Sequence, residues 1–170
     1  IKAFKDNVSI KSCLSYTFSV SNSQGASLIK DRPFTAEMTR SIMLLKEKPY
    51  RPRMADYRIG VFFTGREQLG EGAKTTAPVY YANRWDIQPS DTAAYLRGEK
   101  VKPTKQIVFY IDNTFPEKWK PYLREGVTQW NELFEQIGFK DVVAAKDFPT
   151  DDPEFDPDNI KYSCVRYAPS

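Results

Sequence analysis

Ile107-Val108-Phe109-Tyr110-Ile111 is the continuous apolar run that decides the fold. An apolar run without polar alternation predicts a strand covered on both faces, and such strands lie in the middle of a sheet. The segment from Lys120 to Ile137 follows it with apolar residues at three- and four-residue intervals, which predicts a helix. A second apolar strand, Asp141 to Ala145, completes a βαβ unit, for which we expect a right-handed crossover.

The ends of this helix carry separate signals. Thr114 and Glu117 have the spacing of a capping box, whereas Pro121 favours a later first turn, and both starts stay open. Gly138 is expected to end the helix in either case.

The N-terminal half of the chain alternates with period 2. Between Val8 and Val20 the even positions are mostly apolar and the odd positions mostly polar, which predicts a half-buried strand. After a turn at Asn22 to Gly25, alternation over Phe34 to Leu44 predicts a second strand, bulged at Arg40.

Two further strands are predicted at Tyr57 to Phe63 and at Val79 to Ile87. A glycine-rich loop from Thr64 to Ala77 separates them. Its glycines are expected to be turn residues, because no helix start follows them as a phosphate site would require: Gly65, Gly70 and Gly72. We expect consecutive strands to pair antiparallel.

Lys46 to Arg58 is rich in both basic residues and prolines. A basic binding patch is one interpretation. We favour an extended connector, because proline disfavours helix and the neighbouring Glu47 and Asp56 dilute the charge. A short helix from Asp91 to Arg97, closed by Gly98, follows farther along the chain.

The predicted fold class is therefore α+β. Residues 1–104 form an antiparallel β region, and residues 105–170 form a βαβ half with one long backing helix.

Composition narrows the function classes. With 170 residues, 41% of them hydrophobic, the chain is long enough for one good core or two small subdomains. The formal net charge of +3 is too small to hold phosphate backbones, so we expect no nucleic-acid partner. No apolar run approaches the roughly 20 residues of a membrane span. Because the chain begins at Ile1 rather than Met, we expect a processed product or an excised segment.

The residues offer no catalytic, cofactor or metal site. The chain has no histidine, which excludes a histidine-containing triad and histidine-ligated metal within it. Cys13 and Cys164 are interpreted as two buried free thiols, with a disulfide between them left open. An acidic loop from Asp147 to Asn159 is expected to be solvated. A calcium site there is the alternative, although the EF-hand glycine is missing.

The order of motifs along the chain resembles a known family. From Lys105 to Ser170 it is similar to the start of a metzincin-type zinc peptidase domain, in which a first strand leads into a long backing helix. Upstream segments are similar to those preceding that domain in large zinc-dependent metallopeptidases of Bacteroides-like bacteria: Leu45 to Pro49, Pro52-Arg53, Asp56, Arg58-Ile59-Gly60, Phe62-Phe63 and Arg84-Trp85. The closing stretch, Tyr162 to Ser170, also resembles that family.

This resemblance implies a secreted or periplasmic hydrolase that cleaves peptide bonds with zinc-bound water. Its histidines and general-base glutamate would lie beyond Ser170, on a helix carrying His-Glu-x-x-His. The chain would be a non-catalytic segment, truncated before that helix, and would need the downstream region of the same polypeptide, zinc and a peptide or protein substrate. By itself it is expected to bind zinc no better than a generic acidic surface.

In such an enzyme the chain's role would be support. The helix would pack under the sheet and against the metal-bearing helix, with Trp119 and Trp130 filling the layer between them. Gly126 would permit close approach of another backbone, since glycine inside a helix costs about 1 kcal/mol relative to alanine unless the space is needed. The approaching backbone would be either the central strand at Phe109 or, in the full enzyme, the zinc-bearing helix.

The alternative function is a free-standing secreted module that binds protein or carbohydrate without enzymatic activity. Aromatic side chains on the β half would form its platform: Tyr80, Tyr81 and Trp85. Aromatic residues are also common at half-buried strand positions, so the same residues fit an ordinary core. Substrate, oligomeric state and activity of the parent enzyme are left open.

Overall fold

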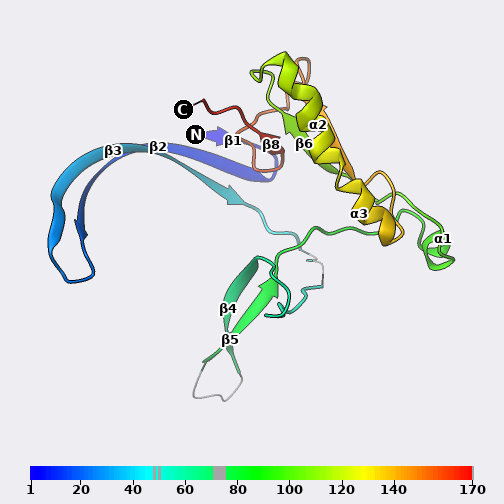
Figure 1. Ribbon diagram of the computed structural model, residues 1–170, viewed down its shortest axis with the longest axis horizontal. Helices are drawn as coiled ribbons and strands as arrows, with labels where there is room; N and C mark the ends of the chain where they lie inside the picture. The colour runs from blue at the N-terminus through cyan, green and yellow to red at the C-terminus, as the bar shows by residue number, and fades with distance from the viewer. Residues whose placement is uncertain (48, 50, 71–75, 170) are drawn as a thin grey trace. The chain divides into compact units, whose positions relative to one another are not determined.

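The computed structural model describes residues 1–47, 49, 51–70 and 76–169 of the chain (Figure 1). They form a mixed architecture of sheets and short helices, compatible with the α+β class. In chain order the elements are β1 (Lys2–Ala3), β2 (Asn7–Ser21), β3 (Ser27–Met43), β4 (Phe63–Leu69), β5 (Thr76–Ala82), α1 (Thr92–Leu96), β6 (Ile107–Ile111), the 3-10 helix η1 (Glu117–Trp119), α2 (Lys120–Thr128), α3 (Asn131–Gln136), β7 (Val143–Asp147) and β8 (Ser163–Val165).

The chain divides into two units that interleave along the sequence. The first unit contains residues 1–44, 107–132 and 143–170, and the second contains residues 45–106 and 133–142. The domain boundary expected after residue 104 stays a prediction. Among the helices of the described residues, none combines the length and the hydropathy needed to cross a bilayer.

β2 and β3 form the long antiparallel hairpin of the first unit, and β1 pairs with β2 at its base. The predicted turn is present: the Asn22 side chain accepts hydrogen bonds from two backbone N–H groups, and Gly25 has a φ of 83°. The predicted bulge at Arg40 is wrong, because Arg40 lies in regular register opposite Ile10. The irregularity lies near the turn instead.

Asp31 accounts for that irregularity. Its φ of 48° is unusual for a non-glycine residue. Its backbone N–H donates to Ser19 Oγ over 3.0 Å, and the Ser19 hydroxyl donates to Asp31 Oδ1 over 3.3 Å. Since these bonds replace ladder hydrogen bonds, the strands change register between Phe18 and Ser21.

The second hairpin, β4 and β5, corrects two predictions. Tyr57 to Phe62 is not a strand, because Asp56 accepts from the Arg58 backbone N–H and its carbonyl accepts from Ile59, which closes a turn. The strand begins only at Phe63 and occupies part of the predicted loop.

Gly65 is consequently a strand residue and not a turn glycine. It lies opposite Tyr80, whose ring would be 3.4 Å from a Cβ added at Gly65. Residues 71–75, including Gly72, lie outside the described residues. The preceding connector is irregular and extended, as predicted, over its described residues; Lys48 and Tyr50 lie outside them.

The βαβ prediction is confirmed in its main features. β6 is the central strand of a three-stranded parallel sheet in the order β7-β6-β8, and α2 packs against β6 and β7. Ile107 and Ile111 are buried, as the continuous apolar run requires. The ring of Tyr110 lies 5.0 Å from that of Phe155 and 5.5 Å from that of Tyr162.

The predicted single long helix is two helices. Pro121 stands in the first turn of α2, which supports the later start, whereas Thr114 bonds Asp112 and not the helix. α2 ends at Thr128 and α3 begins at Asn131, whose side chain donates to the Val143 carbonyl and accepts from the Val143 N–H. These bonds to β7 fix Asn131 at a helix start and interrupt the helix.

The expected packing of Gly126 against the central strand at Phe109 is wrong, whereas its packing against a downstream helix stays a prediction. The residue is exposed, and a Cβ added there would meet no atom of the described residues within 4 Å outside the neighbouring helix backbone. Trp119 and Trp130 are 44% and 60% exposed, so the described residues do not bury the expected aromatic layer. Trp119 does contact Tyr167, with ring centroids 6.0 Å apart.

The second unit has a small core of its own. Asp91 caps α1 by accepting from the Ala94 N–H over 2.9 Å, and Gly98 follows the helix with a φ of 85°, both as predicted. The buried residues are Ala94, Val101, Phe139 and Val142. Tyr95 stacks on Phe139 at 5.0 Å and donates its hydroxyl proton to the Ile137 carbonyl.

Candidate functional site

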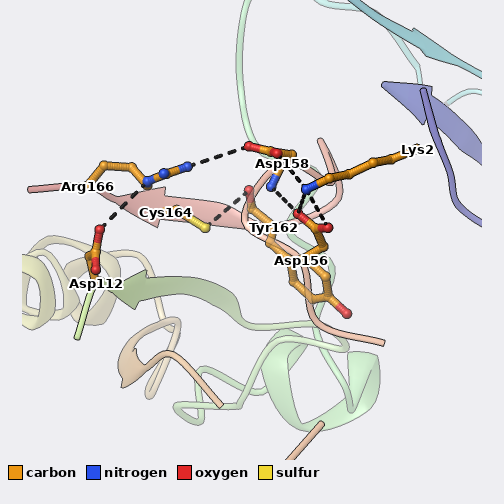
Figure 2. A network of polar contacts seen from close by, with 7 residues as sticks. All are labelled: Lys2, Asp112, Asp156, Asp158, Tyr162, Cys164 and Arg166. Atoms are coloured by element: carbon orange, nitrogen blue, oxygen red, sulfur yellow. Dashed lines mark hydrogen bonds and ion pairs between the residues drawn. The ribbon is translucent and has the colours of Figure 1, made fainter. Parts of the chain in front are cut away.

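Charged side chains of the first unit gather around β8 and the acidic loop (Figure 2). Lys2 lies between two carboxylates, with Nζ 2.9 Å from Asp156 Oδ2 and 2.7 Å from Asp158 Oδ2. Arg166 is 3.7 Å from Asp158 and 3.7 Å from Asp112. We call these five residues the charged network. It joins β1 to the acidic loop and to the segment after β8.

Asp112 is the most enclosed member of the charged network. It directly follows β6, so the central strand holds it in place. The Thr114 backbone N–H is the largest cause of a pKa below the usual range for this carboxyl, and the Thr114 hydroxyl, the Tyr167 backbone N–H and the Arg166 charge lower it further against the opposing effect of burial. Asp112 is therefore ionised at neutral pH.

Asp156 is also ionised. Burial acts to raise its pKa, but the hydrogen bonds from Lys2 and from the Asp158 backbone N–H outweigh burial and lower the pKa overall. The pKa of Lys2 is raised, chiefly by its hydrogen bond to Asp158 and then by the one to Asp156. The hydrogen bond between Lys2 and Asp156 therefore favours the charged form of both residues.

Cys164 lies beside the charged network on β8 without an activating partner in the described structure. Burial raises the pKa of its thiol, so the protonated and poorly nucleophilic form dominates at neutral pH. Its Sγ is 4.0 Å from the Tyr162 carbonyl. The network thus holds ionised carboxylates, and the thiol beside it is protonated, a combination that suits fixed ion pairs better than acid, base or nucleophilic catalysis.

The acidic loop is organised by its own backbone. Asp152 accepts from the Glu154 N–H, and Asp156 accepts from the Asp158 N–H. In the described part of the chain, no three histidine, cysteine, aspartate or glutamate side chains are grouped as metal ligands would be. The calcium alternative therefore gains no support from this loop, part of which is held by Lys2.

A buried amide pair anchors the same loop to the hairpin. The Asn7 side-chain amide donates to Asn159 Oδ1 over 2.8 Å, and the two residues are only 4% and 6% exposed. Asn159 Oδ1 also accepts from the Lys161 N–H. This pair holds the start of β2 against the loop that leads into β8.

The two cysteines are free. The prediction that both are buried is wrong for Cys13, which is exposed on β2, whereas Cys164 is half-buried. Cys13 lies at an odd position of the alternating strand, which faces away from the apolar side.

The proposed aromatic platform does not share one face. Tyr80 and Tyr81 are consecutive on β5, and successive strand residues point to opposite sides. Tyr80 is 47% exposed and packs edge-on against Phe63 at 5.1 Å, while Tyr81 is half-buried. Trp85 is 53% exposed and lies beyond the end of the strand.

Comparison with family models gives one assignment. The model described as "Domain of unknown function (DUF5117)" matches residues 1–90. The chain belongs to the DUF5117 family. Searches of curated proteins and of solved structures gave no significant match. The family match covers β1 to β5, whereas α1 and all that follows lie outside it.

No sequence signal revealed the charged network. Lys2 and its partners Asp156 and Asp158 are more than 150 positions apart, and each occurs among ordinary surface charges. Only the pairing of β6 with β8 brings Asp112 and Arg166 together. The sequence analysis predicted no catalytic or metal-binding residue in this chain, so there is no such position to locate in the structure.

Proposed function

We propose that this DUF5117 chain is a non-catalytic segment of a secreted zinc-dependent peptidase and that it supports a metal site located beyond Ser170. The main support is the β6-α2-β7 unit, in which a buried central strand leads into a helix that packs on the sheet. This is the arrangement implied by the resemblance to metzincin-type domains.

Exposed aromatic side chains near α2 add support. Tyr122 is 74% exposed and Trp130 is 60% exposed. Exposed apolar patches on soluble proteins commonly mark surfaces that another element covers. In the proposed enzyme, that element is the zinc-bearing helix.

The charged network has a supporting role in the same proposal. Asp112, at the end of the central strand, receives hydrogen bonds from the turn that leads toward α2. Arg166 connects it to the acidic loop. The network would hold the edges of the sheet in a fixed geometry while the chemistry takes place on the downstream helix.

The test uses the full-length polypeptide and two matched substitutions. Trp130→Ala is expected to reduce zinc retention and peptide hydrolysis at least about threefold, because the zinc-bearing helix that would cover Trp130 loses an aromatic contact and loosens beside the metal. Trp85→Ala removes a comparably exposed tryptophan from the second unit and is the control. Equal effects of both changes, or a polypeptide that ends without His-Glu-x-x-His, would overturn the proposal.

The alternative of a free-standing binding module predicts a different result. A polypeptide without a downstream metal helix, together with saturable binding of an oligosaccharide that Trp85→Ala abolishes, would favour the module. Zinc bound at one equivalent per full-length chain would favour the peptidase.

A further inference from the structure

A cleft in the second unit is lined by three arginines. It has a volume of about 290 Å³ and is formed by Arg51, Pro52, Arg53 and Arg84. Arg51 and Arg53 come from the connector before β4, and Arg84 follows β5. The charged network and α2 belong to the first unit, so this cleft has a separate location in the chain.

Backbone hydrogen bonds fix the two segments of the cleft to each other. The Ala82 N–H donates to the Arg53 carbonyl over 2.9 Å, and the Ala55 N–H donates to the Tyr80 carbonyl over 2.8 Å. Met54 accordingly forms an antiparallel bridge with Tyr81. The connector is therefore held beside β5 around Met54.

Arg84 reinforces this arrangement. Its Nη2 donates to the Arg51 carbonyl over 2.6 Å, which places its guanidinium group against the connector. Arg84 thus shapes the cleft by holding the connector at Arg51.

Local carboxylates do not neutralise the connector arginines. Asp56 is engaged by Arg58, and Asp86 accepts from the Gln88 side chain. Among the described residues, no ion pair includes Arg51 or Arg53. Arg51 and Arg53, both exposed, are therefore open to a ligand.

The spacing of the arginines indicates the shape of the ligand. Arg51 and Arg53 are alternate residues of an extended segment, so their side chains lie on one side of it, about 6–7 Å apart along the chain. Carboxylates at alternate positions of an extended peptide have the same spacing. Guanidinium groups pair with carboxylates through two parallel hydrogen bonds, which suits them to this recognition.

We propose that Arg51 and Arg53, in the cleft that Arg84 shapes, bind an extended acidic peptide segment whose alternate carboxylates pair with their guanidinium groups. The low net charge of the chain and the nearby Asp56 and Asp86 disfavour a longer polyanion such as nucleic acid. The site does not depend on the peptidase proposal, since it needs neither zinc nor the first unit.

The test is fluorescence anisotropy with a labelled Ser-Asp-Ser-Asp-Ser-Asp peptide at an ionic strength of about 0.05 M, where screening is modest. Saturable binding is expected, with at least about tenfold weaker binding by the Arg51→Gln/Arg53→Gln variant, because each lost charge-assisted pair is strong. The control variant is Arg32→Gln/Arg40→Gln on β3. It removes the same charge outside the cleft and should change the dissociation constant less than about twofold.

Two further measurements separate recognition from charge and from misfolding. Arg51→Lys/Arg53→Lys keeps the charge but loses the paired donors, and is expected to bind several-fold more weakly than the parent. Far-ultraviolet circular dichroism confirms that each variant is folded. Equal weakening by the β3 control, absence of binding by the folded parent, or stronger competition by inorganic phosphate or oligothymidylate than by unlabelled peptide would overturn the proposal.

Discussion

The β2-β3 hairpin and the β6-α2-β7 unit use apolar residues in opposite ways. In the short strand β6, Ile111 is fully buried and Ile107 is 6% exposed. In the long hairpin, the apolar residues Phe34 and Met38 remain 45% and 38% exposed. Ile107 and Ile111 share one face of β6, and Val108 and Tyr110 on its other face are half-buried. Alternation thus determines which face of a strand is apolar, whereas a continuous apolar run accompanies a strand that is at least partly covered on both faces.

The exposed apolar face of the hairpin is nevertheless ordered. Tyr16 and Phe34 are opposite each other in the strand register, and their rings stack with centroids 5.3 Å apart. Phe18 meets Phe34 edge-on at 5.5 Å. Cross-strand aromatic pairs of this kind each contribute roughly 0.2–1 kcal/mol, so local pairing stabilises the hairpin where a closed core does not.

The largest expected effect comes from replacing one isoleucine by alanine in the buried strand β6, compared with the same replacement in the exposed hairpin. Ile111→Ala should lower the free energy of unfolding by about 2–5 kcal/mol, because it leaves a cavity in the core. Ile42→Ala on β3, where the side chain is 62% exposed, should cost less than about 0.5 kcal/mol. Urea unfolding of both variants measures the difference, and equal losses would refute the contrast between a covered strand and an open hairpin.

The second prediction concerns the anchor between the two regions. Asn7→Ala should destabilise the first unit by about 1–3 kcal/mol, because it leaves the buried Asn159 without one of its partners. Asn83→Ala removes a side chain with an exposed hydrogen bond to Thr64 and serves as the control. If a double-mutant cycle of Asn7→Ala with Asn159→Ala gave no coupling, the amide pair would not be the anchor.

The third prediction is that Asp112, which directly follows β6, makes the stability of the fold depend on pH. The folded-state pKa of Asp112 lies below its ordinary value of 3.8, so its contribution to stability is present above that value and is lost as the pH falls through the lower folded pKa. Asp112→Asn should therefore reduce the loss of stability below about pH 4. Acid titration of the parent and of Asp112→Asn, followed by circular dichroism, measures this difference, and parallel stability curves below about pH 4 would contradict it.

The smallest effect is expected at two glycines. Gly126→Ala should raise the free energy of unfolding by about 0.5–1 kcal/mol, because the helix position is open and alanine favours helix. Gly98→Ala should lower it by about 1 kcal/mol, since Gly98 has a φ of 85° that side chains disfavour. Thermal melts that moved both variants in the same direction would contradict this assignment.

Periodicity predicted the elements best where the pattern was long or unbroken. The alternation of β2 and the apolar run of β6 identified strands at nearly their observed bounds, and Asp91, Gly98 and Gly138 marked helix ends. Each of these signals is local, because it depends on residues a few positions apart.

The sequence predictions were wrong where contacts with residues distant in the sequence determine the structure and the local pattern does not. Asn131 interrupts an otherwise continuous helical periodicity because its side chain bonds the backbone of β7. Gly126 occurs on an apolar helix face, yet periodicity does not reveal whether anything packs there. The charged network and the arginine cleft could not be predicted, since each needs segments that only the fold brings together.

Hydrogen exchange of the full-length polypeptide, with zinc and after chelation, tests the proposed support of a metal site most directly. Amides of α2, Lys120–Thr128, are expected to exchange at least about tenfold faster after chelation, because the metal-bearing helix that covers them loosens. Amides of β4, Phe63–Leu69, should be unaffected and provide the internal control. Unchanged exchange in α2 in a polypeptide shown to bind zinc would contradict the account.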